Sequence, residues 1–227
     1  MKWLRRILIV VVVLLIIAAG VVFFYLPVRT DARLNVVLPH EPYQPSAAAQ
    51  ALQDTLRLAD LHADPLLWKR DIVKRNTRGH TDIPRLIEGG FVLQVFSVVS
   101  KSPKNTNYVK NADDSDAMTM AAIVSGWPMR TWHSVIERAL YLAWKLEDAA
   151  ERSDGAMRVV GSKAELQAAL DDRVLAGILL SEGGHPLEGD MANLQRMYDA
   201  GFRVLGLQHF FDNELGGSLH GVNHSGL

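Results

Sequence analysis

The dominant hydrophobic feature of the chain is an uninterrupted apolar run near its N-terminus. Residues 7–26 include no charged side chain and are mainly Val, Ile and Leu. At 1.5 Å per residue, a helix over this run is about 30 Å long, which is the thickness of a bilayer hydrocarbon core. A soluble core helix of that length would carry a polar face, and this run has none. The pattern therefore predicts a transmembrane helix, which we assign to residues 1–28.

The charges that flank this run indicate its orientation. Lys2, Arg5 and Arg6 precede it on a short leading segment, which favours an N-terminus in the cytoplasm and a body on the other side. A cleavable signal peptide is the alternative, although the run is longer than the usual apolar region of about 7–15 residues. We predict an uncleaved signal anchor, with the body on the periplasmic or extracellular side.

Beyond this helix, apolar strands alternate with amphipathic helices. Residues 29–55 indicate a linker followed by a short leading helix, and residues 56–227 a folded domain. Strands are predicted over residues 56–61, 91–99, 157–160, 174–180 and 202–207, and helices over 83–88, 117–153 with a break near 127, 162–171 and 191–200. Continuous apolar strands separated by helices are typical of a parallel sheet covered on both faces.

Polar residues that can bind metals follow three of these strands. His62 and Asp64 follow the first, Glu182 follows the most apolar one, and His209 follows the last. Residues at the carboxyl ends of several strands meet at one mouth in a (β/α)8 barrel, whereas the glycine-rich signatures of nucleotide-binding folds are absent from the sequence. We therefore predict an α/β fold of the TIM-barrel type. Only four or five strand–helix units can be counted, so we expect the barrel to be incomplete.

His62 and Asp64 are two positions apart, so in an extended segment their side chains point the same way and can bind one ion. Asp60 is available to support them. Because such pairs also arise by chance, a solvated loop histidine and a helix-capping aspartate remain the alternative.

Glu182 follows the strand 174–180, where a carboxylate is costly unless it is paired, protonated or bound to metal. A surface glutamate that enters a turn is the alternative. His209 is flanked by two phenylalanines and could ligate a metal or donate a hydrogen bond to a substrate carbonyl; alternatively it is a packed, satisfied side chain. His185 is interpreted as a loop residue, as are His220 and His224.

Composition narrows the chemistry. The formal net charge of −1 gives nucleic acid no electrostatic support as a partner. The chain has no cysteine, which excludes disulfides, thiolate nucleophiles and cysteine-based zinc sites. The GxSxG signature of serine hydrolases is also absent. Any metal must therefore be held by His, Asp and Glu.

Four segments carry a more specific signal. They are LADLHADPLLW from residue 58, GGFVLQVFSVV from residue 89, LLSEGGHPLEGD from residue 179 and GFRVLGLQHFFDNELGGSLHG from residue 201. In this order they resemble the membrane (renal) dipeptidase family of zinc metallopeptidases. The resemblance implies a (β/α)8 barrel of the metallo-dependent hydrolase type, with two zinc ions at its mouth.

By this resemblance, His62 and Asp64 are ligands of the first zinc and Glu182 is the carboxylate that bridges both ions. His209 matches the family histidine that contacts the substrate and polarises the scissile carbonyl, so it is both the catalytic and the substrate-binding residue. The implied activity is hydrolysis of dipeptides by a hydroxide shared between the two ions, a chemistry that needs no nucleophilic side chain.

The family's remaining zinc ligands lie on strands beyond the last residues of this sequence. We therefore expect the chain to correspond to the N-terminal part of a dipeptidase and to be inactive alone, with a homodimer possible. Two other interpretations stay open: a related barrel amidohydrolase that acts on another amide or a lactone, and a catalytically dead, membrane-tethered binding protein.

Overall fold

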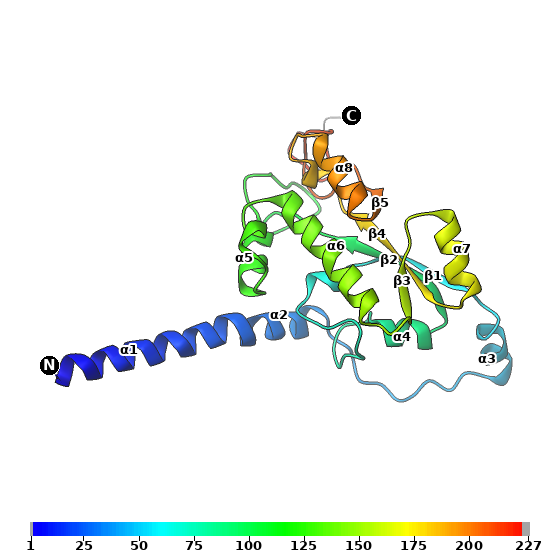
Figure 1. The fold of residues 1–227 in the computed structure, drawn as a ribbon, viewed down its shortest axis with the longest axis horizontal. Coiled ribbons are helices and arrows are strands. Elements are labelled where there is room, and N and C mark those ends of the chain that lie inside the picture. Colours follow the sequence, from blue (N-terminus) through cyan, green and yellow to red (C-terminus); the bar gives the residue numbers. More distant parts are fainter. Residues whose placement is uncertain (1, 224–227) are drawn as a thin grey trace.

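A parallel sheet forms the centre of the protein, as seen in a computed structural model that describes residues 2–223 (Figure 1). Its strands are β1 (Leu58–Ala63), β2 (Phe91–Val98), β3 (Met157–Val159), β4 (Leu175–Ser181) and β5 (Phe202–Leu205). Every pairing is parallel, in the order β1, β2, β4, with β3 and β5 both paired to β4. The predicted parallel α/β arrangement is confirmed.

The strand order is that of a barrel segment. β1, β2, β4 and β5 follow one another as neighbours, which is the order of consecutive strands in a (β/α) barrel. β3 pairs with the first residues of β4, whereas β5 pairs with its last residues along the same edge. Four of the predicted strands therefore form the barrel wall, and β3 is a short addition beside it.

Helices precede and follow these strands along the chain, and a side-chain N-cap sets the first residue of each of them except the last. They are α3 (Ala47–Gln53), α4 (Ile83–Glu88), α5 (Ala117–Val124), α6 (Val135–Glu151), α7 (Lys163–Asp171) and α8 (Ala192–Asp199). The side chains of Asp82 and Ser162 accept from the backbone N–H three residues later and so cap the helices predicted over residues 83–88 and 162–171. Leu142 and Leu146 of α6 are fully buried in one core with Phe96 and Leu179 of the sheet.

The long N-terminal helix extends further than the sequence indicates. α1 (Lys2–Gly20) continues through a π-helical turn (Val21–Tyr25) into α2 (Leu26–Leu34). The 33 residues form one helix, and an 18-residue stretch of it has a mean hydropathy of 3.5 and is not buried, so the helix is long and apolar enough to cross a membrane. The linker predicted from residue 29 instead begins after Leu34. The charged end of α2 stays helical because it packs against the body, where Pro27 and Asp31 are buried.

Pro27 also explains a contact between this helix and the body. A proline has no N–H to donate to the carbonyl four residues earlier, which here belongs to Phe23. Nζ of Lys69 donates to that carbonyl at 2.9 Å and lies 4.9 Å from the ring centroid of Phe24. The body therefore lies against the final turns of the apolar run.

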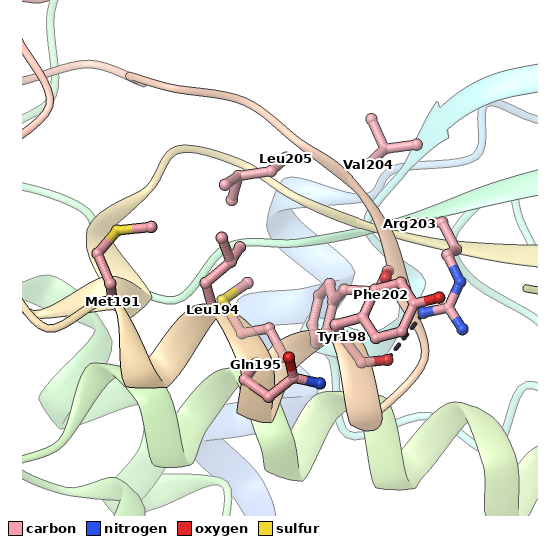
Figure 2. A pocket seen from close by; sticks show the side chains of 9 residues that line it. Met191, Leu194, Gln195, Tyr198, Phe202, Arg203, Val204 and Leu205 are labelled. Atoms are coloured by element: carbon pink, nitrogen blue, oxygen red, sulfur yellow. Dashed lines mark hydrogen bonds between the residues drawn. The ribbon is translucent and has the colours of Figure 1, made fainter.

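The outer side of β5 leaves an apolar groove against α8. Its cavity of about 460 Å³ is lined by Met191, Leu194 and Tyr198 from the helix side and by Val204 and Leu205 from the strand side (Figure 2). None of the predicted site residues lines it. This groove is the flank of the barrel wall, while the candidate site lies at the ends of the strands.

Candidate metal centre

His62 and Asp64 stand at the carboxyl end of β1. His62 is the last residue but one of the strand, and Asp64 follows it directly. Asp60 supports this end of the strand, because its Oδ1 accepts from the backbone N–H of His62 at 3.2 Å and its Oδ2 accepts from Nε2 of buried Gln94 at 2.8 Å. Two neighbouring strands thus fix the backbone that presents the His62 imidazole.

Glu182 stands at the corresponding end of β4. Its backbone N–H donates to the carbonyl of Val98 at 3.0 Å, and Oγ of Ser97 donates to its Oε1 at 3.0 Å. Its side chain is only 11% exposed. The next residue, Gly183, has φ +85°, and a Cβ there would lie 2.4 Å from Nδ1 of His185. A glycine is therefore required for the turn that follows Glu182.

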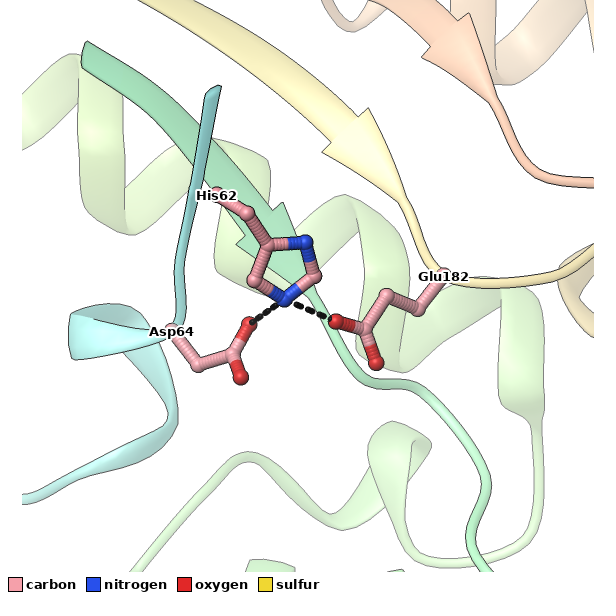
Figure 3. Close-up of side chains that lie close together, drawn as sticks. All are labelled: His62, Asp64 and Glu182. Carbon is pink, nitrogen blue, oxygen red and sulfur yellow. Dashed lines mark ion pairs between the residues drawn. The ribbon is translucent and has the colours of Figure 1, made fainter. Parts of the chain in front are cut away.

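The three side chains converge on one point (Figure 3). One ligand atom from each of His62, Asp64 and Glu182 lies within 4.8 Å of the others, and this is the one such group of three found among residues 2–223. Nε2 of His62 contacts Oε1 of Glu182 and lies 3.7 Å from Oδ1 of Asp64. That Asp64 oxygen is buried and has no hydrogen-bond partner among the described residues. A buried carboxylate oxygen without a donor needs a cation, which this arrangement can accommodate.

His209 joins the group from the segment after β5. Its Nε2 lies 3.0 Å from Oε2 of Glu182, so the two carboxylate oxygens of Glu182 face two different imidazoles. Both oxygens of the Glu182 carboxylate are therefore directed into the group. The structure brings together all four residues that the sequence singled out.

The electrostatics of the group suit metal binding. Burial, followed by the nearby charge of Glu182, raises the pKa of Asp64. Burial lowers the pKa of His209, which keeps this imidazole neutral at pH 7. Two carboxylates held close together in a partly buried site repel each other, and a divalent cation between them relieves that repulsion.

His185 was interpreted from the sequence as a loop residue, but it is only 5% exposed, within a short 3₁₀ turn (His185–Leu187). Its ring centroid lies 4.1 Å from that of Phe211, and burial lowers the pKa of His185 to about 4. A single histidine in a glycine-rich segment gives no signal of burial. The hydrogen bond from Ser97 to Glu182 was not predicted either, because a single serine in an apolar strand gives no indication of which side chain it contacts.

His220 does not belong to the ligand group. His220 packs its ring against Tyr108 and Phe210, and its Nδ1 is 2.9 Å from the carbonyl of Tyr108. His224, which the sequence analysis also placed in a loop, lies outside the described residues. Asp116, in an acidic cluster, caps α5 and pairs with buried Arg138.

A parallel barrel wall with His, Asp and Glu side chains gathered at its strand ends defines a metal-dependent hydrolase type of protein. The comparison with protein families is specific on this point. The chain belongs to the membrane dipeptidase family (Peptidase family M19), whose family model matches residues 46–226. The resemblance seen in the four sequence motifs is thereby confirmed, and membership of a metallopeptidase family implies a metal cofactor.

Two solved structures are similar to this chain. One is a dipeptidase AC of the same metallopeptidase family. The two sequences are 26% identical, the match covers 68% of this chain and 43% of the dipeptidase chain, and the TM-score is 0.49. The other is a metallo peptidase from Rhodobacter sphaeroides liganded with a phosphinate mimic of the dipeptide L-Ala-D-Ala, with 23% identity over 68% of this chain and 46% of its own, at a TM-score of 0.51. This chain therefore spans less than half the length of either protein. A comparison with curated protein sequences gave no match.

Proposed function

We propose that this chain is the N-terminal, membrane-anchored part of a metal-dependent dipeptidase. His62, Asp64 and Glu182 are its metal ligands, and His209 is its catalytic and substrate-binding residue. The observation that carries this proposal is the convergence of three strand-end ligand atoms within 4.8 Å of one another, with an unpartnered carboxylate oxygen among them.

Zinc is the metal we propose, with two ions in the complete enzyme. The available donors are imidazole nitrogen and carboxylate oxygen, which zinc accepts in hydrolytic sites. When bound, such a pair supplies a water of lowered pKa and a Lewis acid for the scissile carbonyl. Glu182 fits the bridging position, because its two oxygens face His62 and His209 and Ser97 holds one of them.

His209 supplies the hydrogen bond to the substrate in this proposal. A lowered pKa leaves its imidazole neutral, with one nitrogen able to donate to the carbonyl oxygen on which negative charge develops. We propose dipeptides as the substrates, in line with the L-Ala-D-Ala mimic bound by the similar protein from Rhodobacter sphaeroides.

The described chain accounts for half of a barrel. It contributes four strands to the wall and three candidate ligands, whereas a closed barrel has eight strands. Since the two similar structures are more than twice as long as the part they share with this chain, we propose that hydrolysis requires the remaining strands and that the chain alone is inactive. The apolar N-terminal helix is proposed as a signal anchor, with the body on the periplasmic or extracellular side.

The test measures zinc stoichiometry and L-Ala-D-Ala hydrolysis for this chain and for a version extended through the rest of the barrel. Two zinc ions and turnover are expected only in the extended protein. His62→Ala should abolish both, whereas His40→Ala, which removes an exposed histidine from the linker, should change neither.

Zinc binding with no dipeptide turnover would leave the metal site standing and refute the substrate, and a screen of other amides and lactones would follow. No zinc above background in either protein would refute the metal assignment and favour a binding protein.

A further inference from the structure

The end of the N-terminal helix is fixed to the body by a buried carboxylate. Asp31 is only 1% exposed, although it belongs to a helix whose other polar side chains face outward. Its Oδ2 accepts from Nε of Arg78 at 2.7 Å and lies 3.1 Å from Nε of Arg70, whose side chain is 3% exposed. A charge at this depth is tolerated because both guanidinium groups neutralise it.

Backbone contacts reinforce this pairing. Asn35, which ends the helix, donates from its side chain to Oδ1 of Asp31 at 2.8 Å, and its carbonyl accepts from the N–H of Gly79 at 3.2 Å. The guanidinium of Arg70 lies where a Cβ of Gly79 would be, 1.7 Å from Nη1, and Gly79 has φ +71°. This position therefore admits only glycine, and the loop closes directly on the arginine that pairs with Asp31.

The two arginines lie in the segment that follows the candidate metal ligand of β1. Residues 65–82 run from Asp64 to the N-cap of α4 with one short 3₁₀ turn (Pro65–Leu67) as regular structure. Segments of this length without regular structure depend on side-chain contacts for their conformation. We name residues 65–82 the β1–α4 segment.

The helix end and the metal site also share a cavity. A space of about 210 Å³ is lined by Asp64 together with Asn35, Arg70, His80 and other residues of the β1–α4 segment. Asn35 therefore forms part of the wall of a hollow that opens beside a candidate ligand. The end of the helix and a candidate ligand therefore line the same small volume.

We propose that the membrane helix is a structural part of the metal site, in which Asp31 is a positioning residue that acts through Arg70 and Arg78 on the β1–α4 segment and so on Asp64. This rests on the proposed function, since it takes Asp64 as a metal ligand. In this arrangement the anchor does more than hold the protein at a membrane: it completes the support of its site.

A contact from α6 predicts which part of the β1–α4 segment depends on Asp31. Nζ of Lys145, on α6, donates to the carbonyls of Leu66 and Trp68, so the start of the β1–α4 segment has a second support. Loss of the Asp31 contact should therefore loosen residues 70–82 more than residues 65–68. A general loss of structure would loosen both parts equally.

The experiment compares Asp31→Asn with the wild type, using the full chain in detergent micelles and measuring hydrogen exchange and zinc affinity. Exchange in residues 70–82 should become at least tenfold faster, with α6 unchanged, and zinc should bind roughly tenfold more weakly, at the lower end of the effect of residues that support metal ligands. Arg33→Gln is the matched control, because Arg33 is exposed on the same last turn and should change neither quantity.

Arg78→Gln offers a second, milder variant, since Arg78 is 28% exposed. If the two groups act through one contact, residues 70–82 of the double variant should exchange no faster than those of Asp31→Asn alone. Equal exchange in all variants would overturn the proposal, as would faster exchange with unchanged zinc affinity. If neither the wild type nor the extended protein binds zinc, the proposed function fails, and hydrogen exchange alone then decides whether the helix positions the segment.

Discussion

Glu182→Gln separates the electrostatic role of Glu182 from its structural role. The substitution keeps the size of the side chain and an oxygen that can accept from Oγ of Ser97. It removes a negative charge whose oxygen lies within 4.8 Å of an Asp64 oxygen. At an effective dielectric constant near 20, that repulsion amounts to about 3 kcal/mol, before any relief by protonation.

Opposite effects are therefore expected on stability and on metal binding. Without metal, Glu182→Gln should raise the free energy of unfolding by about 1–3 kcal/mol because the repulsion with Asp64 disappears. Zinc affinity should fall by at least about 100-fold, since losing a ligand costs no less than losing its supporting residues.

The assay is thermal or denaturant unfolding of the full chain at pH 8 after chelation, together with a zinc competition titration. Glu151→Gln, at the exposed end of α6, is the control for the loss of one negative charge. A Glu182→Gln protein that binds zinc within threefold of the wild type would refute the ligand assignment. A metal-free variant less stable than the wild type by more than about 1 kcal/mol would refute the electrostatic reasoning.

Two further predictions concern groups outside the ligand set. Arg138→Met should cost about 3–5 kcal/mol of unfolding free energy, because buried Arg138 pairs with Asp116 and donates to the carbonyls of Ser100 and Thr131. The control is exposed Arg130→Met, which should cost at most ~1 kcal/mol. Denaturant unfolding that gave the same loss for both variants would contradict the prediction. Burial lowers the pKa of His185 to about 4, so as the pH falls this histidine is protonated in the unfolded chain before it is protonated in the folded one. The free energy of unfolding should therefore decrease between pH 6.5 and pH 4, by up to about 3 kcal/mol. His185→Phe should lose this acid sensitivity in unfolding curves recorded between pH 7 and 4, and an unchanged pH profile would show that another group is responsible.

Local signals in the sequence predicted the parts of the fold that depend on short-range chemistry. The helices predicted over residues 83–88 and 162–171 form where Asp82 and Ser162 cap them, and a capping side chain lies only three residues from its N–H partner. The site was also predictable in outline. His62 lies at the end of β1, Asp64 and Glu182 directly follow β1 and β4, and parallel strands end at one edge of a sheet.

Long-range contacts account for what the sequence did not reveal. The helical end of α2 carries charges typical of a linker, but its Asp31 pairs with arginines more than thirty residues away, which no local pattern in the sequence indicates. β3 was indistinguishable from a wall strand by its composition, and its true position depends on which end of β4 it meets. Burial of His185 depends on Phe211, which comes from a separate part of the chain.

The proline of the N-terminal helix has a consequence for how substitutions at this interface would behave. The acceptor for Lys69 is a main-chain oxygen, so any side chain at position 23 could present it, whereas its availability depends on the missing N–H of Pro27 four positions later. The recognition element and the residue that creates it are thus different residues. Substitutions of Phe23 can leave the contact with Lys69 intact. A replacement of Pro27 would add a backbone N–H that can donate to the Phe23 carbonyl, and this N–H would compete with Lys69 for that oxygen.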